Sequence, residues 1–386
     1  MPYLLQLVII LLLTKLGAHL SNMLKFPSVI GELLVGVLAG PAVLNLLVPN
    51  TFTNYFAELG VIVLMFIAGL EGDLGSLLRY WKPSLTVAIL GVIIPTGSAF
   101  LLCYYGFDFS AKTAMFLGLI LSATSVSISV QVLREMHRLN SPEGSMILGA
   151  AVADDIICVI LLGICVSLFG TNTGSQQAIS LMLGLMFLFF ILTLILGKWF
   201  VPKFLALFSH LNASENDTTA ALVLCFGFAL LAVTLGMSDV LGAYFAGLAI
   251  SETKFKERLA LKIEPIGYAV FIPVFFVSIG LNISFKGMGQ DLFFIISLIV
   301  IAILGKQIGC GLGARCFGFS FTNANIVGAG MVSRGEMALV VANVALNAHL
   351  IDQNHYTAMI MVTVITTLLA PLLLKYYIQK SKQLKA

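Results

Sequence analysis

Two adjacent acids, Asp154 and Asp155, lie within an apolar run over residues 146–169 that is long enough to cross a bilayer. A carboxylate at the centre of a membrane helix costs roughly 2.5–3.5 kcal/mol on insertion scales. We therefore expect an adjacent pair of carboxylates there to have a function. Neighbours on a helix point about 100° apart, and we expect one carboxylate to face a water-filled cavity and the other a buried cation. Such groups can exchange a proton for a hard cation such as Na⁺. The alternative is a structural pair that the backbone and a buried base satisfy.

Lys306 supplies a cation at a comparable depth. It lies near the centre of the apolar run over residues 291–316, too deep for its ammonium group to reach the membrane surface easily. It can neutralise one of the two aspartates, and a buried lysine can also carry a proton itself. A purely structural ion pair is the rival interpretation.

Hydroxyl groups are dense over residues 122–129, at the middle of a third apolar run, and they include Thr124 and Ser125. Hydroxyls there can satisfy backbone groups freed by a broken helix, or can supply oxygen ligands to an ion. Close packing of helices through small residues is the alternative.

A second stretch of this kind, residues 328–336, combines three glycines with Ser333, Arg334 and Glu336. Interrupted helices at corresponding places in two halves of a chain indicate a transport site. We therefore expect both stretches to break their helices. Arg334 and Glu336 are expected to neutralise broken-helix ends rather than to contact an ion.

The composition identifies the elements that must hold these residues. Of the 386 residues, 59% are hydrophobic and only 10% are charged, whereas a soluble domain has roughly 25% charged residues. We expect an all-α membrane protein, because a lipid-exposed backbone must satisfy its own hydrogen bonds. Thirteen apolar segments are predicted, over residues 3–20, 27–48, 55–72, 84–105, 111–131, 146–169, 178–200, 217–236, 239–251, 264–282, 291–316, 323–347 and 355–378.

Basic residues in the loops test this segment count, because cytoplasmic loops are rich in Lys and Arg. One set of alternate loops holds sixteen of them: Lys25, Arg79, Lys82, Arg134, Arg138, Lys198, Lys203, Lys254, Lys256, Arg258, Lys262, Arg315, Lys375, Lys380, Lys382 and Lys385. The other set holds only Lys112 and Lys286. We therefore expect an external N-terminus and a cytoplasmic C-terminus.

Two short motifs recur seven segments apart. Residues 29–36 resemble residues 240–247, and residues 66–71 loosely resemble residues 277–282. An odd offset makes the second copy enter the membrane from the opposite side, which is the inverted-topology repeat of secondary transporters. The run with Lys306 and the run with the aspartates then belong to different copies, which favours a site between them.

Several other residues are given no central role. Glu71 and Asp73 are expected in a solvated loop at the cytoplasmic end of their segment, and His137 is expected to be solvated in a basic loop. The six cysteines show no metal-ligand spacing and are interpreted as packing residues. The net charge of +3 is too small to suggest nucleic acid as a partner.

Together, these features resemble the monovalent cation:proton antiporter-2 family of bacterial sodium/proton antiporters, and most closely its NapA-type branch. The resemblance rests on the aspartate pair, on Lys306, on the hydroxyl-rich segment and on the motifs at residues 275–281 and 333–336. It implies that Asp155 is the main Na⁺ ligand and proton acceptor. Asp154 would also be a Na⁺ ligand, and would pair with Lys306 when no ion is bound. Thr124 would line the helix crossing.

The resemblance also implies a domain organisation and a mode of action. A dimerisation domain would comprise residues 1–83 and 211–289, a moving core residues 84–170 and 290–386, and a linker span residues 171–210. The core would slide like an elevator in a homodimer of the bacterial cytoplasmic membrane. Paired aspartates imply electrogenic exchange of Na⁺ or Li⁺ for protons, without a cofactor and without enzymatic activity.

Four other functions stay open from the sequence. K⁺/H⁺ exchange on the same fold is the nearest, and Na⁺-coupled transport of an organic solute is more remote. An intramembrane aspartyl protease needs aspartates from two helices, which adjacent residues do not supply. An ion channel would conduct without proton coupling.

Overall fold

The computed structural model describes residues 3–169, 176–282 and 292–383. Every regular element in these ranges is helical. The α-helices are α1 (Tyr3–Met23), α2 (Ser28–Ala39), α3 (Thr51–Glu71), α4 (Leu74–Arg79), α5 (Trp81–Leu101), α6 (Ala111–Ser122), α7 (Val126–Glu135), α8 (Pro142–Phe169), α9 (Gln176–Ile195), α10 (Val201–Phe208), α11 (Asn216–Thr234), α12 (Asp239–Ser251), α13 (Lys256–Ile266), α14 (Ile272–Leu281), α15 (Leu292–Arg315), α16 (Phe321–Gly330), α17 (Glu336–Asn347) and α18 (Gln353–Gln383). Three π-helical turns, η1 (Leu102–Gly106), η2 (Leu196–Phe200) and η3 (Gly267–Phe271), continue α5, α9 and α13.

Ten helical stretches within the described ranges are long and apolar enough to cross a membrane, and three shorter apolar helices accompany them. Each of the thirteen predicted segments overlaps at least one of these helices, so the prediction of an all-helical, multi-span membrane protein is confirmed. Lys286 and Lys385, which contributed to the loop-charge argument, lie outside the described residues.

Several predicted boundaries are wrong, and two of them show why. The second segment was expected to run to residue 48, but α2 ends at Ala39, and the chain turns at Gly40. The tenth segment was expected to begin at residue 264, but helix begins at Lys256. The second segment was predicted too long because apolar residues continue past the end of α2 into a turn. The tenth was predicted too short because the first turns of α13 are charged.

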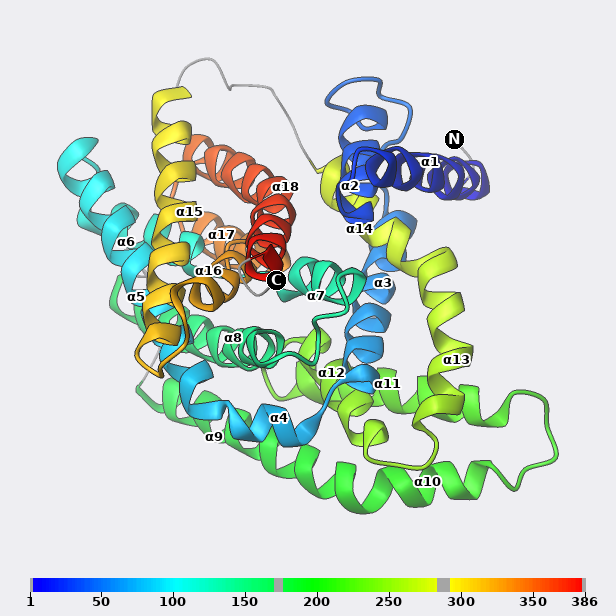
Figure 1. Ribbon diagram of the computed structural model, residues 1–386. Coiled ribbons are helices and arrows are strands. Elements are labelled where there is room, and N and C mark those ends of the chain that lie inside the picture. Colours follow the sequence, from blue (N-terminus) through cyan, green and yellow to red (C-terminus); the bar gives the residue numbers. More distant parts are fainter. Residues whose placement is uncertain (1–2, 170–175, 283–291, 384–386) are drawn as a thin grey trace.

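The helices pack as two groups, which Figure 1 shows on its left and right sides. The crossing group comprises α5–α8 and α15–α18, in which α5 packs on α6, α8 and α15, while α16 packs on α15 and α18. The flanking group comprises α1–α3 and α11–α14, in which α3 packs on α12 and α14, and α2 on α1 and α14. Helix α9 contacts α8 of the first group and α11 of the second.

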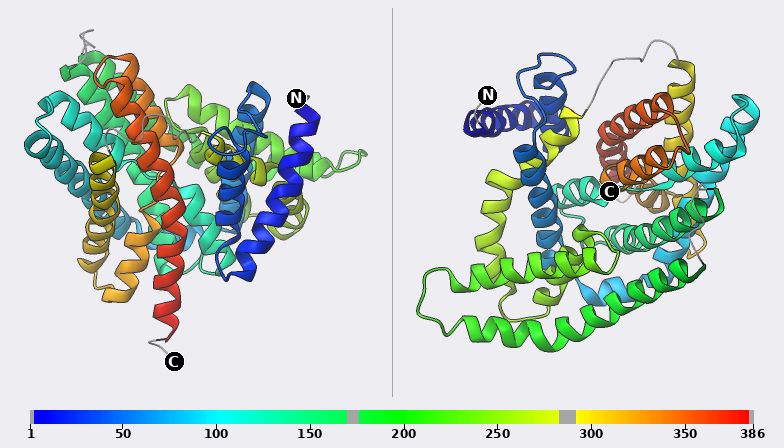
Figure 2. Two further views of the ribbon diagram at one scale, coloured as in Figure 1. Left: turned by 90° about the horizontal axis from the view of Figure 1, so that it is seen from above. Right: turned by 180° about the vertical axis from the view of Figure 1, so that it is seen from behind.

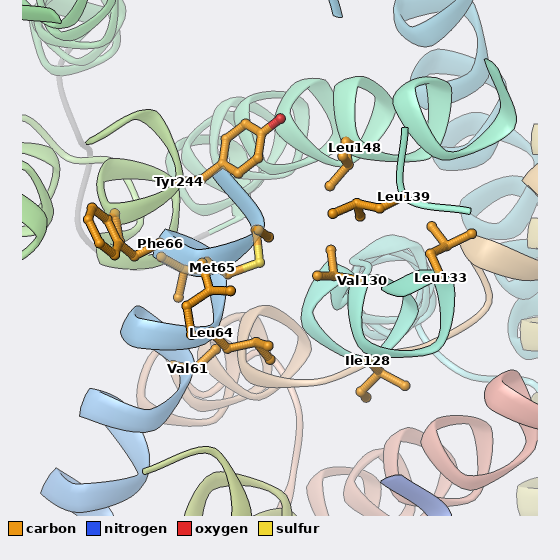
Figure 3. Packing of buried hydrophobic residues seen from close by; sticks show 14 of the residues in the cluster. Val61, Leu64, Met65, Phe66, Ile128, Val130, Leu133, Leu139, Leu148 and Tyr244 are labelled. Atoms are coloured by element: carbon orange, nitrogen blue, oxygen red, sulfur yellow. The ribbon is translucent and has the colours of Figure 1, made fainter. Parts of the chain in front are cut away.

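Apolar side chains fill the contact between the two groups (Figure 3). From the flanking group come Val61, Leu64, Met65 and Phe66 of α3 and Tyr244 of α12; from the crossing group come Ile128, Val130 and Leu133 of α7, Leu139 and Leu148. The two groups therefore meet along a largely nonpolar surface.

The inverted repeat is visible in two equivalent helix contacts. A Cβ atom on Gly36 of α2 would overlap the carbonyl oxygen of Val277 in α14, and a Cβ atom on Gly247 of α12 would overlap that of Phe66 in α3. Gly247 lies 211 residues after Gly36 in the chain, and Val277 likewise lies 211 residues after Phe66. The contact of α2 with α14 is thus repeated as the contact of α12 with α3. The two ends of the chain lie on opposite sides of the bundle (Figure 2).

Candidate functional site

Two broken helices cross at the centre of the crossing group. The first break separates α6 from α7 at residues 123–125, and the second separates α16 from α17 at residues 331–335. The breaks hold each other: the backbone N–H of Ser125 donates to the carbonyl of Ser333 at 2.9 Å, and the Ser333 hydroxyl donates to the carbonyl of Ser125 at 2.6 Å. Backbone groups that the helices no longer satisfy are paired across the crossing, as a low-dielectric surrounding requires.

Arg334 lies within the second break and is fully buried. Its Nε and Nη2 atoms donate to the carbonyl of Leu121, at 2.9 and 2.6 Å, and Nη2 also donates to the carbonyl of Ala302 at 2.8 Å. Leu121 is in the last turn of α6, where unpaired carbonyls carry partial negative charge. The guanidinium group therefore neutralises a broken-helix end. The side chain of Glu336 lies outside the described part of the structure, although α17 begins at this residue.

Asp154 is bound on both carboxylate oxygens. Lys306 Nζ lies 2.8 Å from Oδ1, and the two side chains are 0% and 1% exposed. The backbone N–H of Thr124, in the first helix break, donates to Oδ2 at 3.0 Å. The Thr124 hydroxyl in turn points to the carbonyl of Met331 at 3.4 Å. The ion pair is thereby tied to both broken helices.

Asp155 has different surroundings. Its half-buried side chain lines a cavity of about 10 Å³ between the two helix groups, together with Val126 of α7, Met65 of α3 and Tyr244 of α12. A cavity of about 10–15 Å³ holds a single water-sized species. The neighbouring carboxylates thus face apart, Asp154 to a buried cation and Asp155 to a small cavity at the contact of the groups.

A larger cavity of about 340 Å³ opens on the N-terminal side of the bundle. Glu58 of α3 and Asp239 at the start of α12 line it, as does Gly335 from the second helix break. Val240 lines both this cavity and the small one at Asp155. Two acids therefore flank the approach to Asp155 from this side.

A charged network on the opposite side was missed by the sequence reasoning. Arg134 at the end of α7 pairs with Glu71 of α3 at 2.7 Å and with Glu264 of α13 at 2.5 Å, and it lies over the ring of Tyr268 at 4.2 Å. Tyr268 donates from its hydroxyl to Gln131 of α7 at 3.0 Å. These bonds join the two helix groups beside a cavity of about 1030 Å³.

The expectation that Glu71 is solvated in a loop is therefore wrong. Glu71 ends α3, and its side chain is only 26% exposed because Arg134 covers it. The signal in the sequence was an arginine at the end of a hydroxyl-rich apolar segment, which needs an acid from another segment. Asp73 does lie in the loop, where it caps α4, and the hydrogen bond from the Ser76 hydroxyl lowers the pKa of Asp73.

Within the described residues no group of three or more His, Cys, Asp or Glu side chains forms a metal cluster. The site is therefore a pair of carboxylates with one lysine, close to two broken helices.

The sodium/hydrogen exchanger transmembrane model matches residues 8–380. The chain belongs to this family. It is 43% identical over 380 residues to a Na⁺/H⁺ antiporter of Enterococcus hirae, with 97% of each chain covered. It is 44% identical over 382 residues to the Na⁺/H⁺-K⁺ antiporter GerN of Bacillus cereus, with 99% of this chain and 98% of that protein covered.

The fold is similar to that of a solved sodium proton antiporter. The sodium proton antiporter MjNhaP1 from Methanocaldococcus jannaschii matches with a TM-score of 0.71 at 17% identity, over 95% of this chain and 93% of that chain. A further structure of the same antiporter, at pH 8, gives a TM-score of 0.65. At this level of identity the similarity shows the fold alone.

Proposed function

We propose that this exchanger is a secondary active antiporter that exports Na⁺ or Li⁺ in exchange for protons. One observation carries the proposal: Asp155 lines a cavity for a single water-sized species between the two helix groups, while Lys306 pairs with Asp154 beside it. A carboxylate placed there can hold either a cation or a proton. The relatives from Enterococcus hirae and Bacillus cereus are a Na⁺/H⁺ antiporter and a Na⁺/H⁺-K⁺ antiporter, which supports the same assignment.

Competition for the carboxylates couples the two ions. Asp155 is the main Na⁺ ligand and the proton acceptor. Asp154 joins it as a ligand when Na⁺ enters and returns to Lys306 when Na⁺ leaves. The backbone N–H of Thr124 donates to Asp154. Binding of the ion to Asp154 would therefore also affect the helix crossing. Ser125, Ser333 and Arg334 keep the two breaks in register and lie behind the ion site.

The exchange is proposed to be electrogenic, as in the NapA-type branch of the monovalent cation:proton antiporter-2 family. Two protons that enter for one Na⁺ that leaves move one net charge inward. That charge is worth about 2.3 kcal/mol per 100 mV of membrane potential. The potential of an energised membrane then drives Na⁺ export.

Movement of the crossing group against the flanking group would expose Asp155 to each side in turn. The largely nonpolar contact between the groups favours sliding, and the bonds of Arg134 to Glu71 and Glu264 on the C-terminal side must break and re-form during the movement. The crossing group corresponds to residues 84–170 and 290–386, and α9 with α10 to the linker. The flanking group would form the homodimer, with an external N-terminus and a cytoplasmic C-terminus in a bacterial cytoplasmic membrane.

K⁺ is the second candidate cation, because the Bacillus cereus relative GerN is a Na⁺/H⁺-K⁺ antiporter. The choice between ions depends on the size and rigidity of the cavity beside Asp155.

Proteoliposomes with a trapped pH-sensitive dye test the assignment, with Na⁺, Li⁺ and K⁺ added in turn. Proton movement with Na⁺ and Li⁺ that disappears in Asp155→Asn is the expected result. A response to K⁺ alone would change the substrate, and no response to any of the three ions across pH 6–9 would reject antiport of these ions.

A further inference from the structure

A nonpolar groove runs along the outer side of α8, between the crossing group and α9. It consists of two adjoining cavities of about 430 and 420 Å³. Four residues line both cavities and so mark where they join: Leu74, Thr193, Leu194 and Phe245. The views in Figures 1 and 2 show α9 on the outside of the bundle, where it faces the surrounding lipid.

Thr193 places a buried hydroxyl group in this otherwise nonpolar groove. Its side chain is 4% exposed, and its hydroxyl has no hydrogen-bond partner among the described residues. A buried hydroxyl without a partner costs about 1–3 kcal/mol. Threonine on a helix can usually donate its hydroxyl to a carbonyl of the preceding turn. The Thr193 hydroxyl makes no such bond, so it is available to an acceptor in the groove. The ester carbonyl of a glycerolipid is such an acceptor.

One end of the groove carries two opposite charges, Lys198 in η2 and Glu252 just after α12. Neither side chain forms an ion pair with another described residue. A phosphate group fits the lysine, and an ammonium group fits the glutamate. Trp81 lines the other cavity and Trp199 directly follows Lys198 in the chain, and tryptophan is enriched at the level of lipid headgroups.

The depth of the groove matches part of an acyl chain. It extends from Ile156 of α8 and Phe190 of α9 at one end to Lys198 at the other. Residues 190 and 198 are separated by about 12 Å along a helix axis. A chain of roughly ten methylene groups fits this length and would cover apolar side chains on both walls.

We propose that the groove binds one zwitterionic glycerophospholipid with a primary ammonium headgroup. Its phosphate pairs with Lys198, its ammonium with Glu252 and an ester carbonyl with the Thr193 hydroxyl, while one acyl chain fills the groove. The chain lies against Val152 and Ala153, directly before the aspartate pair on α8. The lipid therefore occupies a place that changes when the crossing group moves against α9 and α12.

Native mass spectrometry of the purified protein tests this site, with phosphatidylethanolamine and phosphatidylglycerol offered in equal amounts. The wild type is expected to retain one phosphatidylethanolamine per chain in preference to phosphatidylglycerol. Thr193→Phe, which fills the groove where its cavities join, is expected to reduce that retention about tenfold, equivalent to about 1.4 kcal/mol. Thr234→Phe is the matched control, because Thr234 is exposed on α11 and donates its hydroxyl to the Leu231 carbonyl.

The headgroup contact has its own test, which does not depend on how Thr193→Phe folds. Glu252→Gln removes the partner of the ammonium group and is expected to abolish the preference between the two lipids. Glu257→Gln removes an exposed carboxylate from the first turn of α13, outside the groove, and is expected to leave the preference intact. Equal retention of both lipids by the wild type, or unchanged preference in Glu252→Gln, would overturn the proposal. None of these readouts depends on which cation is transported.

Discussion

Lys306 Nζ lies 2.8 Å from Asp154 Oδ1 at the centre of the crossing group, and neither side chain is more than 1% exposed. The two charges neutralise each other where water is excluded. The adjacent Asp155 has its carboxylate on another face of α8, beside the cavity between the helix groups. One acid of the pair therefore neutralises a buried lysine, whereas the other lines a cavity between the two helix groups.

This ion pair predicts an asymmetric response to mutation. Asp154→Asn leaves the Lys306 ammonium group buried without its counter-charge, and we expect a loss of stability of about 3–5 kcal/mol. In the double variant Asp154→Asn/Lys306→Gln both charges are gone, so most of that stability should return. Thermal unfolding in detergent measures the cycle. Additive losses in the double variant would contradict a buried, mutually neutralising pair.

Transport separates two roles of Lys306. If the lysine carries one of the two protons, Lys306→Gln should retain some exchange, and that exchange should be electroneutral. Currents recorded from proteoliposomes on a solid support measure the net charge moved. Unchanged current driven by the membrane potential in Lys306→Gln would show that Lys306 does not carry charge.

Arg334 is expected to be a structural requirement of the helix crossing. Arg334→Gln removes the hydrogen bonds to the carbonyls of Leu121 and Ala302, each of which is then buried without a charged donor. We expect at least about 3 kcal/mol of lost stability from these two acceptors. Arg315→Gln is the control, because that exposed arginine also donates to a backbone carbonyl, that of Phe319. Equal, small effects in the two variants would argue against this role.

The repeat predicts that equivalent glycines respond alike. Gly36→Ala and Gly247→Ala each place a methyl group against a backbone carbonyl of the neighbouring helix, so both should lower the melting temperature. Gly227→Ala in α11 meets nothing within 4 Å and should be neutral or stabilising, because alanine favours helix by roughly 0.5–1 kcal/mol. A large effect at one member of the pair with none at the other would contradict equivalent packing in the two repeats.

Arg134 is expected to hold the two helix groups together on the C-terminal side. Its bonds to Glu71 and Glu264 join α7 to α3 and α13. A double-mutant cycle of Arg134→Gln with Glu71→Gln should give a coupling of about 0.5–3 kcal/mol in unfolding free energy. The cycle of Arg134→Gln with Glu257→Gln serves as the reference for an acid outside the network. Absence of coupling with Glu71 would show that the pair does not stabilise this arrangement.

The sequence predicts the fold well where chemistry restricts the choice. Apolar segments must be helical in lipid, and the polar stretches at residues 122–129 and 328–336 coincide with the observed helix breaks. The two short repeats were recognised from their similarity, and the close helix contacts at Gly36 and Gly247 explain why glycine lies at equivalent positions in both copies. These features follow from local composition.

Features that depend on the third dimension were not accessible in the same way. The distance between Arg134 and Glu264 along the chain conceals their ion pair, and no pattern around Thr193 indicates that its hydroxyl lacks a partner. Helix ends such as those of α2 and α13 were misplaced because turns can be apolar and helical turns can be charged. Packing between distant segments decides all of these cases.

The central claim is that one carboxylate, Asp155, binds either a proton or Na⁺. It is tested most directly by adding Na⁺ to purified protein in weakly buffered detergent solution and measuring the protons released. We predict release by the wild type and by the Glu257→Gln control, and none by Asp155→Asn. Release of the same number of protons by folded Asp155→Asn protein would contradict the account, because another group would then exchange its proton for the ion.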